Sequence, residues 1–180
     1  MPQGGAVRHD PGQFPSAPGG LCGATVEEGS MQLTVRSNHA MRLMMYCALV
    51  KGRLAPVAEI AQACNMSESH LGKIANALAA GGFVETVRGR GGGVRLARPA
   101  AEINVGAVVR RTEIGSCFVE CLDLASNGCP LVEVCRFRSI IGRALEAFLA
   151  VLDGYTLADL VADAGPMRAV LGIENAPAAA

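Results

Sequence analysis

Two short helices around a tight turn, followed by a glycine-rich hairpin, constrain the fold of this chain more than any other feature. The first helix is predicted over residues 57–64. The second runs from an N-cap at Ser67 to about Ala80, where two glycines end it. Its apolar residues recur at helical spacing on one side: Leu71, Ile74, Ala75 and Leu78. This order of elements predicts a helix-turn-helix.

The hairpin is predicted from two short strands, 83–87 and 94–96, joined by the glycine-rich residues 88–93. It would form the wing of a winged helix-turn-helix. Helices are also expected on both sides of this unit. Their expected ranges are Ser37 or Asn38 to about Val50, Asn104 to about Arg111 and Arg136 to about Asp153, with Thr156 and Asp159 as cap and first-turn acid of a short final helix. The expected fold class is therefore mainly α with a small β wing.

The segment from Ser67 to Arg98 is locally basic, although the whole chain has a formal net charge of zero. A helix-turn-helix places its second helix in the major groove, and arginines on a thin hairpin tip can enter a minor groove. The predicted DNA-binding residues are Ser67, Ser69, His70, Lys73, Arg88 and Arg90. The alternative is a plain turn with solvated charges. A nucleotide-binding loop is disfavoured, because the glycines lead into a strand and lack a G-K-[ST] ending.

Three cysteines follow the wing, spaced C-x7-C-x5-C: Cys121, Cys129 and Cys135. Thiolates at short intervals are the ligands that a soft metal centre requires. The chain has seven cysteines, which would leave one unpaired in a disulfide framework, so reduced thiols and a cytoplasmic location are favoured. Cys47 and Cys64 lie in apolar helical segments and are interpreted as small core residues. A DNA-binding unit followed by a metal centre predicts a transcription factor whose DNA affinity depends on that centre.

The expected helix over residues 136–153 has two adjacent apolar rows. The first row is Phe137, Ile141, Leu145, Phe148 and Leu152, and the second is Ile140, Ala144, Ala147 and Val151. One row would suffice for packing within a small domain, so the second predicts a homodimer, as a two-fold DNA site requires. The alternative is a simple core helix. No apolar run is long enough to span a membrane.

The predicted organisation has five parts. They are a disordered leader rich in Gly, Pro and Ser (1–30), a winged helix-turn-helix domain (31–112), a cluster loop (113–136), a dimerisation helix with a C-terminal helix (137–173), and a tail (174–180). Met31 stands immediately before the first organised sequence, so it is an alternative native start of the protein.

Several motifs of this chain resemble those of the Rrf-two family of bacterial iron–sulfur regulators. The wing sequence E-T-V-R-G-R-G-G-G-V-R-L-A-R-P, the C-x7-C-x5-C spacing and the long helix occur in that order, and the resemblance covers residues 31–173. Most similar to the family's nitric-oxide-sensing repressors are H-L-G-K-I at 70–74 and I-N-V-G-A-V-V-R at 103–110. R-L-M-M-Y-C-A at 42–48 and the wing resemble its iron-responsive repressors at least as well.

The resemblance implies a homodimeric repressor that binds a double-stranded DNA operator and carries a [4Fe-4S] cluster on Cys121, Cys129 and Cys135, with [2Fe-2S] as the alternative. Nitric oxide is the expected signal, and iron status is the alternative. The family's wing arginine and recognition-helix contacts map onto Arg88, Ser69, His70 and Lys73. In several nitric-oxide-sensing members an aspartate of the other subunit completes the cluster. Asn38 occupies that position here and is a poor iron ligand, so His39, Cys117 or water are alternatives, although His39 is better interpreted as a surface residue.

From the residues alone, two other classes of protein stay open. A structural zinc protein would use Cys117 together with the three cysteines as a four-thiolate site. An enzyme with a nucleophilic cysteine is disfavoured, because no catalytic base can be placed beside these cysteines and three histidines offer little choice.

Overall fold

The computed structural model describes residues 33–113, 119–123 and 127–173. The predicted leader, the tail and Cys117 lie outside these residues. The helices are α1 (Val35–Leu49), α2 (Val57–Ala63), α3 (Glu68–Ala80), α4 (Val105–Thr112), α5 (Arg136–Asp153), α6 (Leu157–Leu160) and α7 (Ala164–Val170), with short 3-10 turns η1 (Ala100–Glu102) and η2 (Glu120–Leu122). Strands β1 (Val84–Val87) and β2 (Gly93–Leu96) form the antiparallel wing. The expected fold class is confirmed.

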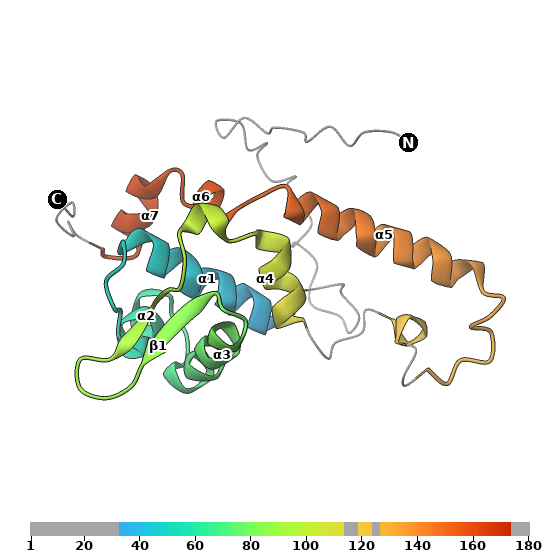
Figure 1. Ribbon diagram of the computed structural model, residues 1–180, viewed down its shortest axis with the longest axis horizontal. Helices are drawn as coiled ribbons and strands as arrows, with labels where there is room; N and C mark the ends of the chain where they lie inside the picture. Colours follow the sequence, from blue (N-terminus) through green and yellow to red (C-terminus); the bar gives the residue numbers. More distant parts are fainter. Residues whose placement is uncertain (1–32, 114–118, 124–126, 174–180) are drawn as a thin grey trace.

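Helix α1 lies at the centre of the fold, with α3, α4 and the wing packed around it (Figure 1). Its buried side chains include Leu43, Met44 and Leu49. The predicted apolar stripe of α3 faces this core: Leu71, Ile74, Ala75 and Leu78 are all buried. Cys47 and Cys64 are also buried, which confirms their interpretation as core residues. Because α3 buries this stripe, its opposite face remains free for a partner.

The wing is anchored to the segment before α2. Ala55 and Val94 exchange two backbone hydrogen bonds of 2.9 and 2.8 Å, so β2 is held on both sides. The hairpin turn includes Gly89 at φ +95°, a conformation that side-chain-bearing residues rarely adopt. Arg88 and Arg90 flank this glycine and are exposed. The wing therefore presents its two tip arginines from a fixed base.

The start of α1 differs from the prediction. Thr34, rather than Ser37 or Asn38, is the N-cap, and its side chain accepts a hydrogen bond from the Ser37 N–H. The Ser37 hydroxyl is buried and hydrogen-bonds the Thr112 hydroxyl at 2.6 Å, so it is not available as a cap. Sequence patterns cannot show this contact, because it joins residues 75 positions apart. The other predicted caps, Ser67, Asn104 and Thr156, are confirmed.

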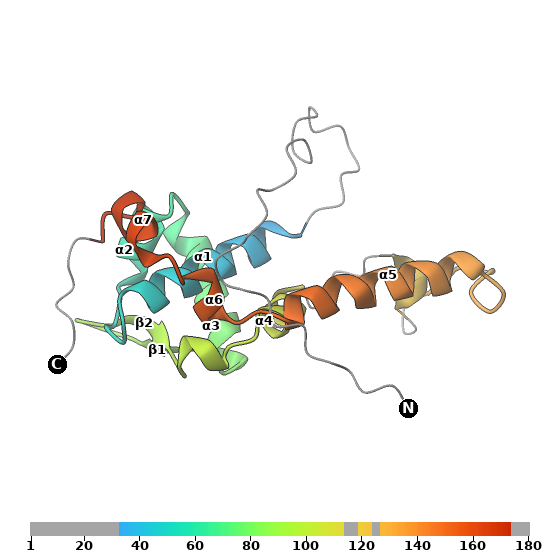
Figure 2. The ribbon, with the colours of Figure 1, turned by 90° about the horizontal axis from the view of Figure 1, so that it is seen from above.

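Helix α5 projects away from the helices around the wing, as two perpendicular views show (Figures 1 and 2). Its bounds match the prediction, and none of its side chains is buried. It is fixed at its C-terminal end, where Arg110 of α4 pairs with Asp153 at 2.6 Å and the Asn104 side chain donates to the Asp153 carbonyl at 2.7 Å. A Cβ on Gly106 would come within 2.1 Å of the Asp153 carboxylate, so a larger residue there would have to displace the Asp153 side chain from its pairing with Arg110.

Helix α7 was not expected from the sequence. It follows α6 and contributes half-buried Met167 to the edge of the core. Within the described part of the chain, no helix is both long and apolar enough to cross a membrane.

Candidate nucleic-acid interface and metal centre

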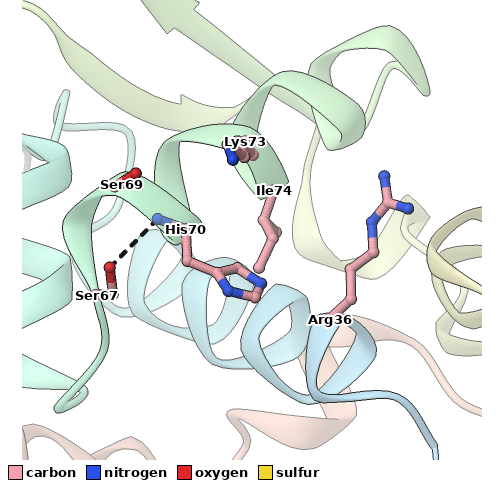
Figure 3. A pocket seen from close by; sticks show the side chains of 6 residues that line it. All are labelled: Arg36, Ser67, Ser69, His70, Lys73 and Ile74. Carbon is pink, nitrogen blue, oxygen red and sulfur yellow. Dashed lines mark hydrogen bonds between the residues drawn. The ribbon is translucent and has the colours of Figure 1, made fainter.

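The residues predicted to contact DNA gather at the N-terminal half of α3. Ser67, Ser69, His70 and Lys73 are all exposed and line one open hollow of about 450 Å³ (Figure 3). The helix begins there because the Ser67 hydroxyl accepts a hydrogen bond from the His70 N–H at 3.5 Å. The structure thus brings these four residues together at the start of α3, next to Ile74 at the edge of the buried stripe.

Arg36 also lines this hollow, although it was not among the predicted DNA-binding residues. It comes from the first turns of α1, which packs against α3. Figure 3 shows its side chain extending from α1 on the side of the hollow away from Ser67. No motif marks Arg36 in the sequence, because only the packing of α1 against α3 brings it to the hollow that Lys73 also lines.

His70 contacts a second histidine, His39 of α1. Their ring centroids are 5.3 Å apart and the rings meet edge to face, and Figure 3 shows the His70 ring pointing toward α1. The His39 Nδ1 is buried and has no hydrogen-bond partner within the described residues. Burial, together with the nearby His70 and Arg42, lowers the pKa of His39 below its usual value. This environment favours the neutral form of the His39 ring.

The wing contributes fewer free cations than the sequence suggested. Arg95 pairs with Glu85 at 2.6 Å, and the Arg98 guanidinium lies 5.3 Å from the centre of the Phe83 ring. Glu85 and Arg95 are direct cross-strand partners, so the hairpin register could have predicted their ion pair. Arg88 and Arg90 form no ion pair within the described residues. They remain the wing residues best placed for DNA.

The three predicted metal ligands lie in one segment between α4 and α5. Cys121 belongs to η2, Cys129 follows a turn in which its N–H donates to the Asn127 side chain at 2.9 Å, and Cys135 is the N-cap of α5. All three thiols are free and half-buried. However, no three His, Cys, Asp or Glu side chains of the described residues are close enough together to hold a metal ion. The donor set fits a soft metal in its chemistry, but its members are not gathered here.

The predicted fourth ligands are placed differently. Asn38 is exposed on α1, His39 is half-buried beside α3, and Cys117 lies outside the described residues. The start of the cysteine segment is nonetheless tied to α1. Glu113 accepts hydrogen bonds from the Thr34 N–H and hydroxyl, both at 2.9 Å, and from the Ser37 hydroxyl. Displacement of Glu113 would therefore act directly on the first turn of α1.

A family model described as "Rrf2: Iron-dependent Transcriptional regulator" matches residues 33–163. Among curated proteins, the HTH-type transcriptional regulator NsrR of Geobacillus kaustophilus is 47% identical over 142 residues, which cover 78% of this chain and 97% of that protein. NsrR of Bacillus subtilis is 42% identical, and the matched region covers 73% of this chain and 90% of that protein. The protein aau3 of Rhizobium meliloti is 45% identical, with coverages of 81% and 94%.

Solved structures agree with this likeness. The T. potens IscR structure has a TM-score of 0.58 at 25% identity, and the matched region covers 82% of this chain and 94% of the IscR chain. The oxidized form of Staphylococcus aureus CymR has a TM-score of 0.55 at 27% identity, with coverages of 72% and 95%. The winged helix, the exposed face of α3 and these relatives lead to one conclusion. The chain belongs to the Rrf2 (Rrf-two) family and is a DNA-binding transcriptional regulator.

Proposed function

We propose that this regulator is a homodimeric repressor that binds an iron–sulfur cluster through Cys121, Cys129 and Cys135, and that nitric oxide releases it from its operator by attacking that cluster. The observation that carries the proposal is the placement of three free thiols between α4 and α5, directly after the DNA-binding unit. The family's description as iron-dependent and the NsrR relatives support it.

On the DNA side, the proposal uses the face of α3 and the wing tip. Ser69, His70 and Lys73 would enter the major groove, with Ser67 at the start of the helix, and Arg88 and Arg90 would reach the minor groove. Loss of one base-specific contact costs about 1–3 kcal/mol. Arg88→Ala and Ser69→Ala should therefore lower operator affinity, whereas Arg95→Ala should have little effect because Arg95 already pairs with Glu85.

On the metal side, three cysteines leave one position of a [4Fe-4S] cluster to another donor, and a [2Fe-2S] cluster is the alternative. Asn38 offers only a neutral amide, while Cys117 would offer a fourth thiolate. His39 has a ring nitrogen without a hydrogen-bond partner within the described residues, so it retains a donor atom. Iron without a thiolate at one position supplies a place where a diatomic molecule can bind. The three thiols must approach one another for such binding, so the cysteine segment has to close.

The proposed dimer uses α5. Ile140, Ala144, Ala147 and Val151 are all exposed and form the second apolar row of this helix. The exposed fractions of Ile140 and Val151 are 62% and 63%. A continuous apolar row on a projecting helix is what a second subunit would cover.

Two contacts would couple the cysteine segment to DNA. Glu113 joins the start of the segment to the first turn of α1, and Arg110 with Asp153 joins α4 to the end of α5. Closure of the segment would act on both junctions. It would change the spacing of the two recognition helices, on which two-site binding depends.

The proposal is tested by anaerobic purification followed by visible absorption and by iron and sulfide analysis. We expect a brown protein, with Cys121→Ala, Cys129→Ala and Cys135→Ala each losing the visible absorption. Cys64→Ala, which removes a buried thiol, is the matched control and should retain it. Full iron and sulfide content in Cys129→Ala would refute the ligand assignment.

An iron-responsive repressor is the second candidate, and the neutral amide of Asn38 at the family's fourth-ligand position favours it. Nitric oxide and an iron chelator, applied separately to the anaerobic protein–operator complex, distinguish the two. Release by stoichiometric nitric oxide supports the first candidate. If a low concentration of the chelator releases the operator and nitric oxide does not, the protein is assigned to iron sensing. A colourless protein that contains zinc would instead support a four-thiolate zinc site that includes Cys117.

A further inference from the structure

Two cations from different helices face the same hollow. Arg36 belongs to α1 and Lys73 to α3, and together with Ser67, Ser69 and His70 they line the open space of about 450 Å³ (Figure 3). Ile74 contributes the apolar part of this lining, and none of the lining residues is acidic. The hollow is therefore positively charged.

Neither cation is paired with a carboxylate in the part of the chain that the structure describes. Three other arginines, Arg53, Arg95 and Arg110, each pair with a carboxylate. Arg36 and Lys73 take part in no ion pair within residues 33–113, 119–123 and 127–173. Two like charges facing one space repel each other, and an anion bound between them adds two attractive interactions that outweigh this repulsion. The arrangement thus favours a bound anion.

The position of the hollow identifies the anion. Lys73 lies one helical turn after His70 on the face of α3 that is proposed to enter the major groove. A duplex docked on that face runs its sugar–phosphate backbone along the side of α3, where α1 approaches it. We propose that Arg36 of α1 and Lys73 of α3 hold one backbone phosphate of the operator between them. This inference rests on the DNA-binding role of α3 proposed above.

The hydroxyls of the hollow suit the same ligand. The Ser67 oxygen accepts the His70 N–H, so its own O–H remains available as a donor, and Ser69 is exposed beside it. The backbone around Arg36 is also held in place. Thr34 and Ser37, on either side of it, both hydrogen-bond Glu113. Arg36 is therefore a phosphate contact whose position depends on the residue that begins the cysteine segment.

The test is an operator titration with Arg36→Gln, Lys73→Gln and the double variant, repeated over a range of salt concentrations. Arg143→Gln is the matched control, because it removes one exposed charge from α5, away from the hollow. Loss of one phosphate contact lowers the slope of log affinity against log salt by about 0.9, which corresponds to roughly 3.5-fold less weakening between about 50 and 200 mM salt. Arg36→Gln should show this change and should weaken operator and scrambled DNA by the same factor. Arg36→Lys should recover most of the affinity.

Single methylphosphonate substitutions along the operator then locate the phosphate. One neutral position on each half-site should weaken binding by the native protein most, weaken binding by Arg36→Gln and by Lys73→Gln less, and have no further effect on the double variant. Unchanged affinity and salt slope in Arg36→Gln, with Lys73→Gln weakened, would overturn this inference but leave α3 as the DNA-binding helix. If both variants bind normally, the proposed role of α3 fails as well. Sensitivity to two different phosphates for Arg36 and Lys73 would also overturn the shared site.

Discussion

Leu43, Leu71 and Leu78 of the DNA-binding unit (residues 33–112) are fully buried, whereas the 18 residues of α5 include no buried side chain. The arm, formed by residues 119–123 and 127–153, carries Leu131, Val134 and Phe137 at 58%, 78% and 57% exposure. The DNA-binding unit is built on a buried core, to which Leu157 and Ile173 from the segment after α5 also contribute. The arm keeps its apolar surface for something outside the single chain. We therefore expect the buried core to hold the DNA-binding unit together, and the arm to depend on the proposed second subunit and on the metal centre proposed for its cysteines.

The largest effect is expected in the core of the DNA-binding unit. Leu71→Ala removes a fully buried side chain, so it should lower the free energy of unfolding by about 2–5 kcal/mol. Leu131→Ala is the same substitution in the arm, where the Leu131 side chain is 58% exposed. It should change the free energy of unfolding by less than about 0.5 kcal/mol. Urea unfolding followed by circular dichroism measures both. Equal losses of stability in the two variants would contradict the difference drawn between the core and the arm.

The second effect concerns the exposed row of α5. Ile140→Glu with Val151→Glu should weaken the proposed dimer at least tenfold, because two unpaired charges would be buried at its proposed interface on α5. Secondary structure should be unchanged, since both side chains are exposed in the single chain. Sedimentation velocity measures the subunit state. Ser139→Glu, which adds one charge to another side of α5, is the control and should have the same subunit state as the native protein.

The third effect separates the cysteines of the two regions. Burial raises the pKa of Cys47 to about 12, so its thiol stays protonated and protected at pH 8. Cys121, Cys129 and Cys135 are half-buried and should be alkylated much faster in metal-free protein. Peptide mass spectrometry after timed exposure to iodoacetamide gives the order in which the cysteines are alkylated. Modification of Cys47 as fast as Cys129 would show that the core of the DNA-binding unit is open.

The smallest effect is a pH dependence within the DNA-binding unit. Hydrogen bonds from Arg53 and Tyr46 lower the pKa of Glu59 below its ordinary value of 4.5. A lowered carboxyl pKa stabilises the fold above the ordinary pKa, and that contribution is lost as the pH falls through the folded-state value. Glu59→Gln should therefore cost up to about 1 kcal/mol at pH 7, since the pair is partly exposed. The difference from the native protein should disappear at low pH in urea unfolding; a constant difference would contradict this assignment.

The sequence was most informative where local chemistry decides structure. Ser67 as a cap, the buried stripe of α3 and the bounds of α5 follow from side-chain type and helical spacing. It was least informative for long-range contacts. Ser37 is an acceptable cap by residue type, but its hydroxyl hydrogen-bonds Thr112 at the end of α4 and Glu113 just after it.

The candidate site shows the same division. The predicted residues of α3 line one hollow because they are close together at the start of the same helix. The neighbours Arg36 and His39 come from α1, and their approach depends on the packing of two helices. The three cysteines were identified by spacing alone, and spacing does not state how closely their sulfur atoms approach. Their role as cluster ligands therefore remains a proposal.

One measurement tests the central claim that the cysteine segment controls the DNA-binding unit. Operator affinity should be measured anaerobically, by fluorescence anisotropy, on a single preparation before and after removal of its iron, with Cys129→Ala as the control that cannot respond. We predict that the iron-loaded protein binds the operator at least tenfold more tightly than the iron-free protein, and that Cys129→Ala matches the iron-free protein in both conditions. Equal affinity of the loaded and iron-free proteins would contradict the account.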